Sequence, residues 1–338
     1  MDAVHIVGAG GIGCAVGYGL CVSGLSVLFV DADAAKIDWG RRYGVAIDAL
    51  PPRPAAFIAF DDWSPSADAV ILLCTKCYDN AAVLERIPAS ATLIPVQNGF
   101  DPLLHVRGHA LEGIASFVSE CLPHRTHTRI TRAGRLHFGY RSPAIKQRPQ
   151  MPDCIATLIR QRRIVGRRIR VEMVEDILPY KYTKLMYNAA ISPLASAAGI
   201  DNGQLLRFPR ARALFFNLLR ENHAILERAD ITLGKVGPFH PSTVAAILRR
   251  PWLAHSLAWA FYPSLRGTYC SMSGDLPAGR TEIDYYNGHL LELAGDTPCL
   301  LNRRVYDLVK RIERERLAPR LDLLDQLNGE LSPLVAFI

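Results

Sequence analysis

Four polar residues recur at helical spacing within an otherwise apolar segment, residues 181–199. They are Lys181, Lys184, Asn188 and Ser192. The last three are four residues apart, so on a helix they drift by only about 40° per step. A helix that is apolar nearly all round is buried, and a narrow polar stripe on it needs partners. Ammonium and amide groups along this stripe could bind an anionic or carbonyl-bearing ligand. Alternatively, a buried lysine pairs with one carboxylate for structural reasons.

The N-terminus holds a glycine-rich loop between two strand patterns. Residues 3–7 and 26–30 have the composition of short buried strands, and a small-residue helical stretch to Ser23 separates them. This order is that of the dinucleotide-binding fingerprint. Within it Gly8 allows the tight turn, Gly10 lets the backbone approach a pyrophosphate, and Gly13 lets helix and strand pack closely. The loop residues predicted to contact a dinucleotide are Gly8, Ala9, Gly10, Gly11, Ile12 and Gly13.

Asp31 ends the second strand pattern and bears on the choice of cofactor. A carboxylate at this place accepts hydrogen bonds from ribose hydroxyls and repels a 2′-phosphate, which favours NADH over NADPH. The alternative is that Asp31 or Asp33 only caps the following helix.

Further strand patterns at 55–60, 69–74 and 92–96 suit a doubly wound sheet, and a hairpin-like stretch near 126–140 predicts antiparallel strands. Lys76 and Asn98 follow two of these strands, at the carboxyl ends where open α/β sheets bind ligands. Lys76 could neutralise phosphate charge, and Asn98 could orient a nicotinamide or a substrate. Their alternatives are a surface lysine and an ordinary Asn-Gly turn.

From about residue 173 the pattern changes to long helical periods, such as 211–229 and 302–317. We therefore expect an α/β protein. A Rossmann-type doubly wound sheet occupies residues 1–172, and an all-helical domain occupies residues 173–338, with a C-terminal extension after about 318. A dense polar stretch at 271–288 could contribute to a site, or Asp275 or Thr281 could simply cap a helix.

The composition limits the class of protein. The chain has 338 residues, of which 49% are hydrophobic and 21% charged, and a net charge of +7. We expect a soluble, cytoplasmic protein with no membrane partner, because no apolar run reaches the roughly 18 residues of a membrane span.

The arginine patch at 160–170 lacks a base-reading motif, so no nucleic-acid partner is expected. Cys74-x-x-Cys77 has no second ligand pair, so no metal is expected. The apolar helices from 211 to 262 could form a homodimer face.

In sequence order, several short motifs resemble those of the ketopantoate reductase family (2-dehydropantoate 2-reductases) over residues 1 to about 315. The motifs are Gly8–Gly13, Cys74-Thr-Lys76, Gln97-Asn98-Gly99, Lys184-Leu-Met-Tyr-Asn188, Asn202-Gly203, Ser271-Met272 and Thr281-Glu282-Ile-Asp284. The resemblance implies a Rossmann domain joined to a helical domain, and a reductase that uses NAD(P)H on a small 2-keto acid.

The resemblance also implies roles for the matched residues. Lys184 falls on the general acid of the family, and Glu282 falls on a glutamate that positions or tunes this lysine and counts among the cofactor contacts. The remaining matched positions, which bind cofactor or substrate, are Lys76, Asn98, Asn188, Ser192, Asn202 and Ser271. Ser192 stands where the family typically has asparagine, the spacing from Ser271 to Glu282 is one residue short, and the family often has a basic residue near Asp31 because it usually uses NADPH.

These observations predict reduction of 2-dehydropantoate to (R)-pantoate, with Lys184 as general acid. One alternative is an NAD-dependent D-2-hydroxyacid dehydrogenase of the mandelate type, which Ser192 and Asp31 favour. Another is a nucleotide-binding sensor without turnover, which the presence of both Lys184 and Glu282 disfavours.

Overall fold

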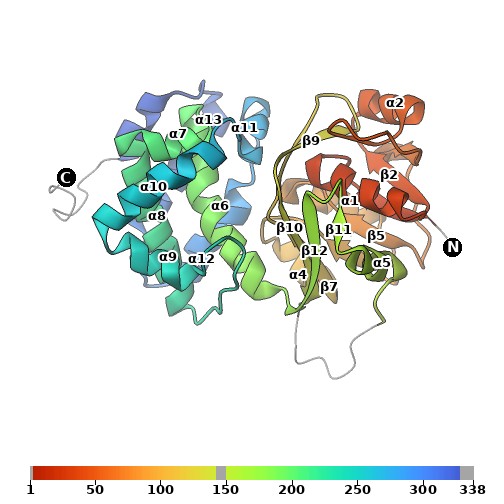
Figure 1. The fold of residues 1–338 in the computed structure, drawn as a ribbon, viewed down its shortest axis with the longest axis horizontal. Helices are drawn as coiled ribbons and strands as arrows, with labels where there is room; N and C mark the ends of the chain where they lie inside the picture. Colours follow the sequence, from red (N-terminus) through yellow and green to blue (C-terminus); the bar gives the residue numbers. More distant parts are fainter. Residues whose placement is uncertain (1–2, 142–149, 328–338) are drawn as a thin grey trace. The chain divides into compact units, whose positions relative to one another are not determined.

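The computed structural model describes residues 3–141 and 150–327, and the chain divides into two compact units, Met1–Lys181 and Tyr182–Ile338 (Figure 1). The sequence placed the boundary after residue 172. Strand β12 (Ile169–Asp176) pairs with β10 as far as Asp176, so the chain stays in the first unit beyond that point. Of the expected C-terminal extension, Leu321–Leu327 forms a 3-10 helix (η5), and residues 328–338 lie outside the described residues.

The first unit contains a five-stranded parallel sheet. Its strand order is β4 (Ala56–Ala59), β2 (Val27–Asp31), β1 (Val4–Val7), β5 (Val70–Leu73) and β6 (Thr92–Pro95). From β1 the chain builds outward through β2 and β4, and then returns to the other side of β1 with β5 and β6. This confirms the doubly wound Rossmann-type fold, whose ligand-binding switch point lies at the carboxyl ends of β1 and β5.

The helices of this unit are α1 (Gly11–Val22), α2 (Ala34–Tyr43), α3 (Asn80–Arg86), α4 (Pro102–Arg107) and α5 (Asp153–Gln161). The near-continuous apolar runs of β2 and β5 are typical of strands covered on both faces. Phe29 and Leu72 are fully buried in one core of the unit, and the residues that follow them, Val30 and Leu73, are fully buried in a second core.

Two smaller sheets complete the first unit. One has the order β11 (Arg163–Ile164), β12, β10 (Gly134–Tyr140) and β7 (Leu111–Ala115). The other has the order β3 (Ala46–Ile47), β9 (His127–Arg132) and β8 (Val118–Cys121). The stretch near 126–140 supplies the predicted antiparallel strands, because β9 pairs antiparallel with β8 and β10 with β7. The two strands do not form a hairpin with each other, because β9 and β10 belong to different sheets. Only Ala133 separates these strands, which is too short for a hairpin turn. A Cβ at Gly134 would lie 2.6 Å from the backbone nitrogen of Phe117, so glycine permits the close crossing.

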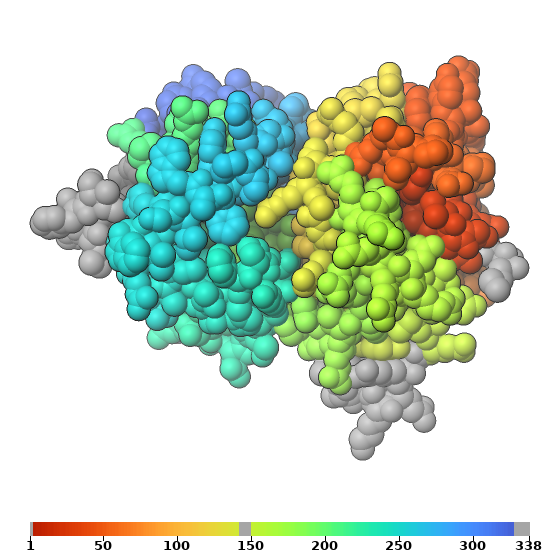
Figure 2. Space-filling view, viewed as in Figure 1, coloured from red at the N-terminus to blue at the C-terminus, as the bar shows by residue number. Residues whose placement is uncertain are grey.

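The second unit is helical, as predicted. It contains most of α6 (Leu178–Ala198), followed by α7 (Asn202–Arg207), α8 (Pro209–Arg228), α9 (Pro241–Leu248), α10 (Pro251–Leu265), α11 (Ser271–Asp275), the 3-10 turn η3 (Leu276–Ala278), the π-helical turn η4 (Asp284–Gly288), α12 (His289–Ala294) and α13 (Leu300–Glu315). The periods at 211–229 and 302–317 correspond to α8 and α13. In the space-filling view of Figure 2, α9 and α10 (teal to cyan) form part of the surface of this unit. Among the described residues, no helix is long and apolar enough to cross a membrane.

Helix α6 contains a proline, and the fold compensates for it. Pro193 has no N–H, so the carbonyl of Ala189 loses its partner within the helix. The side chain of Asn287 donates to this carbonyl oxygen at 3.0 Å, and it also donates to Asn302 at 2.9 Å. Asn222 similarly donates to the carbonyl of Met186 at 2.9 Å. Buried amides from α8 and η4 therefore hold α6 where the polar stripe lies.

We expect Asn287→Leu to lower the free energy of unfolding by about 1–3 kcal/mol, because it leaves the buried carbonyl of Ala189 without a donor. In a Pro193→Ala background the new N–H of residue 193 can serve this carbonyl, so the same substitution should cost about 1 kcal/mol less. Urea unfolding of the four proteins measures both costs. Equal costs in the two backgrounds would assign the effect of Asn287 to its bond with Asn302 instead.

Candidate active site

The glycine loop has the local geometry that its sequence predicted. Gly8 has a φ of +95°, and a Cβ there would lie 2.7 Å from the backbone nitrogen of Thr75. A Cβ at Gly13 would lie 2.0 Å from the carbonyl oxygen of Gly8, so α1 passes β1 too closely for any side chain. At Gly10 nothing lies within 4 Å of the equivalent position. The loop is thus closed by packing at Gly8 and Gly13 and open at Gly10, which fits a backbone that approaches a phosphate.

Asp31, the last residue of β2, binds the glycine loop and does not cap a helix. Its Oδ2 accepts a hydrogen bond from the backbone N–H of Ala9 at 2.8 Å. The same oxygen forms an ion pair with the ammonium of Lys36 at 3.1 Å. Its Oδ1 accepts from the N–H of Asp33 at 3.0 Å. The cap of α2 is Asp33, which accepts from the N–H of Lys36 at 3.2 Å. The carboxylate of Asp31 therefore fixes the loop, and Lys36 partly neutralises it.

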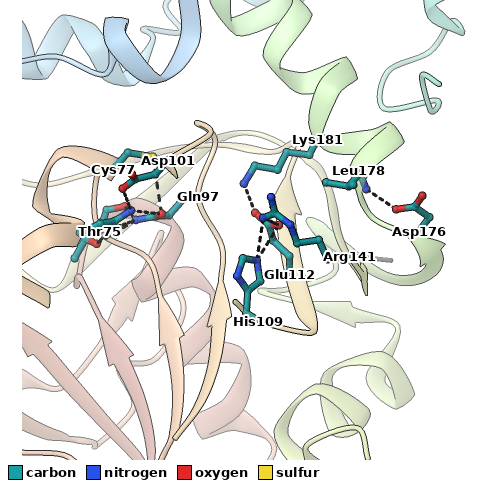
Figure 3. Close-up of polar contacts among 11 residues, drawn as sticks. Thr75, Cys77, Gln97, Asp101, His109, Glu112, Arg141, Asp176, Leu178 and Lys181 are labelled. Atoms are coloured by element: carbon teal, nitrogen blue, oxygen red, sulfur yellow. Dashed lines mark hydrogen bonds and ion pairs between the residues drawn. The ribbon is translucent and has the colours of Figure 1, made fainter. Parts of the chain in front are cut away.

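A buried amide network joins the loops after β5 and β6 (Figure 3). Gln97 donates to the carbonyl of Thr75 and to the side chain of Asn80, each at 2.8 Å, and Asn80 donates to Asp101 at 2.7 Å. The next residue, Asn98, has a buried Oδ1 with no hydrogen-bond partner among the described residues. An unpaired buried acceptor at the carboxyl edge of the sheet fits a ligand that supplies the donor. Lys76 lies half-buried in the loop after β5, directly before the 3-10 turn η2 (Cys77–Asp79).

The second unit carries the other predicted site residues. Lys184 and Asn188 are half-buried in α6, whereas Ser192 is 4% exposed. The thiol of Cys270 donates to the carbonyl of Ser192 at 3.5 Å, which brings the residue before Ser271 against α6. Asn202 is bound to Thr268 through its backbone N–H at 2.9 Å and through its side-chain amide at 3.2 Å. The Oδ1 of Asn202 is buried and, within the described part of the chain, has no partner.

Glu282 is buried in the second unit, with 3% of its surface exposed. Its Oε2 accepts a hydrogen bond from the hydroxyl of Tyr286 at 3.0 Å. The preceding residue, Thr281, is held by Glu313 and accepts from the N–H of Ile283 at 3.2 Å, whereas the N-cap of η4 is Ile283 rather than Thr281. The π-helical turn η4 starts two residues after Glu282.

Comparison with known proteins gives the family. The model of the ketopantoate reductase family PanE/ApbA matches residues 4–143, and the model of its C-terminal domain matches residues 176–313. The chain belongs to the ketopantoate reductase family. The resemblance noted from the short motifs is thereby confirmed.

Individual relatives cover nearly the whole chain. It is 23% identical over 321 residues to a 2-dehydropantoate 2-reductase of Archaeoglobus fulgidus, which covers 93% of this chain and 98% of that one. A crystal structure of a PanE/ApbA family ketopantoate reductase from Ralstonia eutropha JMP134 has a TM-score of 0.71 and 20% identity, with 93% of this chain and 99% of that chain covered. D-mandelate dehydrogenase with NADH and anilino(oxo)acetate has the same TM-score and 17% identity, with 97% and 100% covered. These two structures support the fold.

A buried charge cluster in the first unit was not predicted (Figure 3). Glu112, on β7, is fully buried and forms an ion pair with the buried Lys181 in the first turn of α6. The second carboxylate oxygen contacts His109 at 3.1 Å and Arg141 at 3.3 Å. The ammonium of Lys181 also lies 4.7 Å from the ring centroid of Phe100. Lys181 is thus the structural lysine that the alternative interpretation of the polar stripe described.

The register of the sheet explains how these charges meet. Glu112 lies opposite Gly139 of β10, and a Cβ at Gly139 would lie 3.1 Å from the backbone nitrogen of Ile177. Glycine therefore leaves room for the chain that enters α6, and Asp176 accepts from the N–H of Leu178 at 2.9 Å to start the helix. The only sequence signal was one charged residue inside an apolar strand.

The partners of Glu112 control its ionisation. Burial alone would raise the pKa of this carboxyl, but the charge of Lys181 and the hydrogen bond with His109 outweigh it and lower the pKa from 4.5 to about 2. The difference corresponds to about 3 kcal/mol of stability. Because the pKa is lower in the folded state, this contribution is fully present above pH 4.5 and is lost as the pH falls towards 2.

We expect Glu112→Gln to lower the free energy of unfolding by about 3–5 kcal/mol, since it leaves the ammonium of Lys181 buried beside a neutral amide. The double variant Glu112→Leu/Lys181→Met removes both charges and should recover most of this loss. Denaturant unfolding at pH 7 measures the free energy of unfolding of the wild type and of both variants.

The matched control is the exposed pair of Arg129 and Glu120, which are 3.1 Å apart. Glu120→Gln should cost less than about 1 kcal/mol. A loss for Glu112→Gln no larger than that of the control would contradict the buried ion pair. An equal loss of unfolding free energy in Glu112→Gln and in Glu112→Leu/Lys181→Met would also contradict the buried ion pair.

Proposed function

We propose that this protein reduces 2-dehydropantoate to (R)-pantoate with a reduced nicotinamide dinucleotide. The observation that carries the proposal is the family membership across both units, residues 4–143 and 176–313. The open Gly10 position and the acceptor of Asn98, which no described residue pairs, support a dinucleotide at the carboxyl edge of the sheet. In this proposal the substrate contacts come mainly from the second unit.

A reduced nicotinamide, when bound at the glycine loop, would supply the hydride for the keto carbon of the substrate. Negative charge then develops on the keto oxygen, and Lys184 donates a proton there. Lysine suits this role better than arginine, whose guanidinium gives up a proton too reluctantly. Asn98 and Asn202 each offer a buried Oδ1 that has no partner within residues 3–141 and 150–327, so each can accept a hydrogen bond from a ligand hydroxyl or amide. Asn188, Ser192 and Ser271 complete the substrate contacts.

Glu282 orients Lys184 in this proposal. The hydroxyl of Tyr286 holds one oxygen of its carboxylate, and the side chain is almost completely buried. A carboxylate fixed in this way can hold an ammonium group in one direction while the proton is transferred. Lys76 stays on the cofactor side, as the family resemblance implies.

A mandelate-type D-2-hydroxyacid dehydrogenase is the second candidate. Two observations favour it: Ser192 replaces the asparagine typical of ketopantoate reductases, and Asp31 stands where a basic residue is common. As a member of the polar stripe of α6, Ser192 leaves more space for a ligand than an asparagine at the same position would. Bulky aromatic 2-keto acids and 2-dehydropantoate, assayed in parallel, separate these candidates. Cofactor binding without turnover of any 2-keto acid would instead support a nucleotide sensor.

We expect Lys184→Ala to lower kcat for 2-dehydropantoate by about 10²–10⁴, the range for loss of a general acid. Its affinity for the cofactor should stay close to that of the wild type. Steady-state kinetics at the nicotinamide absorbance band measures kcat, and fluorescence titration measures binding. Lys235→Ala is the matched control, because Lys235 is an exposed lysine of the same unit. A loss below tenfold would remove Lys184 from this role.

We also propose a preference for NADH over NADPH, caused by the carboxylate of Asp31. Lys36 weakens this preference because it pairs with that carboxylate. Asp31→Asn should therefore lower the ratio of kcat/KM with NADH to that with NADPH, by about tenfold, or about 1.4 kcal/mol. Lys36→Met should raise the ratio, because it leaves the carboxylate unopposed. A wild-type preference for NADPH, or shifts of both variants in the same direction, would defeat the proposal.

A further inference from the structure

Two cysteine thiols meet at the glycine loop of the first unit. The thiol of Cys14, in α1, donates to the carbonyl oxygen of Ala9 at 3.2 Å. The thiol of Cys121, at the end of β8, lies 3.6 Å from the same oxygen and 3.2 Å from the carbonyl oxygen of Arg125. Cys14 is fully buried, whereas Cys121 is partly exposed. One backbone oxygen therefore brings a buried and an accessible thiol together.

The packing of α1 on β8 explains this meeting. Gly11 and Cys14 are three residues apart and share a face of α1, and Ser119 and Cys121 are two residues apart and share a face of β8. A Cβ at Gly11 would lie 2.5 Å from the hydroxyl of Ser119, so these two faces are in direct contact. The close contact between Gly11 and Ser119 also sets Cys14 beside Cys121.

The surroundings make the two thiols chemically different. Hydrogen bonds with Cys14 and Thr128, and the charge of Lys36, outweigh burial and lower the pKa of Cys121 to about 7. The same hydrogen bond, together with burial, raises the pKa of Cys14. At neutral pH a substantial fraction of Cys121 is therefore thiolate, which is the nucleophilic form. Burial raises the pKa of Cys21 to about 11 and that of Cys74 to about 12, so these thiols are far less reactive.

We propose that Cys121 is a modification site for small-molecule disulfides, and that Cys14 resolves the adduct into a Cys14–Cys121 disulfide that weakens cofactor binding. The Cys121 thiolate attacks one sulfur of the small disulfide and releases one small thiolate. The Cys14 thiol then attacks the Cys121 sulfur and passes its proton to the departing small thiolate, which leaves as the second small thiol. In total, two protein thiols are oxidised and one small disulfide is reduced to two thiols.

The effect on the cofactor follows from the position of Ala9. A disulfide draws the two sulfurs to about 2.05 Å and removes both S–H donors from the carbonyl oxygen of Ala9. The N–H of Ala9 is bound to Asp31, and the following residue is the open Gly10, so the peptide that moves belongs to the predicted phosphate site. We expect the Kd for NADH to rise about tenfold. This part rests on the proposed function, whereas formation of the disulfide does not.

The test uses the full-length reduced protein and oxidised glutathione at pH 7.5. Intact mass and peptide mapping should show loss of two hydrogens and a peptide linking Cys14 to Cys121. Fluorescence titration should show the weaker NADH binding, and dithiothreitol should reverse both changes. Cys14→Ser should stop at a glutathione adduct on Cys121, Cys121→Ser should give neither product, and the matched control Cys21→Ser should behave as wild type.

The outcomes separate the two parts of the proposal. Absence of the Cys14–Cys121 link in the wild type, or an adduct on another cysteine first, would overturn the modification site. A complete link with an unchanged Kd for NADH would overturn its coupling to the cofactor. Because mass mapping needs no cofactor, failure of the proposed function would appear separately, as a reduced protein that binds neither NADH nor NADPH.

Discussion

The ion pair between Glu112 and Lys181 is the constraint on which the C-terminal end of the first unit depends. A fully buried carboxylate can stay ionised only if cationic groups meet it, and the first turn of α6 supplies the closest of them. Lys184 follows one turn later on the same continuous helix, at a rise of about 4.5 Å. The pair therefore anchors the first turn of α6 on β7 within the first unit.

Buried polar groups in this protein fall into two kinds. Some are paired in full, such as the Gln97–Asn80–Asp101 network and the carbonyl of Ala189, which receives its donor from Asn287 after Pro193 has removed the usual one. These pairs hold loops and helices in place. Others keep an unpaired acceptor, as Asn98 and Asn202 do within the described residues, and both were predicted to bind ligand. An unpaired buried acceptor costs stability unless a ligand supplies the donor, which supports their assignment to the site.

Two different side chains bind the glycine loop at Ala9. Its N–H at Ala9 is bound by Asp31 and its carbonyl at Ala9 by the thiol of Cys14, so the carboxylate and the thiol hold two adjacent peptide units of the loop. Lys36 connects the two, because its charge both pairs with Asp31 and favours the thiolate of Cys121. An acidic residue at position 31 comes with a compensating lysine five positions later.

The sequence alone determined the features that depend on neighbouring residues. The strand, glycine loop, helix and strand order around Gly8–Gly13 predicted the Rossmann-type sheet, and helical periods predicted α8 and α13, because backbone preference and hydrophobic period act over a few residues. Motif order gave the family and the candidate residues Lys184 and Glu282. Only the tertiary structure decided which of the two stripe lysines is structural, that β9 and β10 enter different sheets, and that Cys14 lies beside Cys121. Each of these depends on strand register and packing between distant segments, and a single sequence does not encode that register in any local pattern.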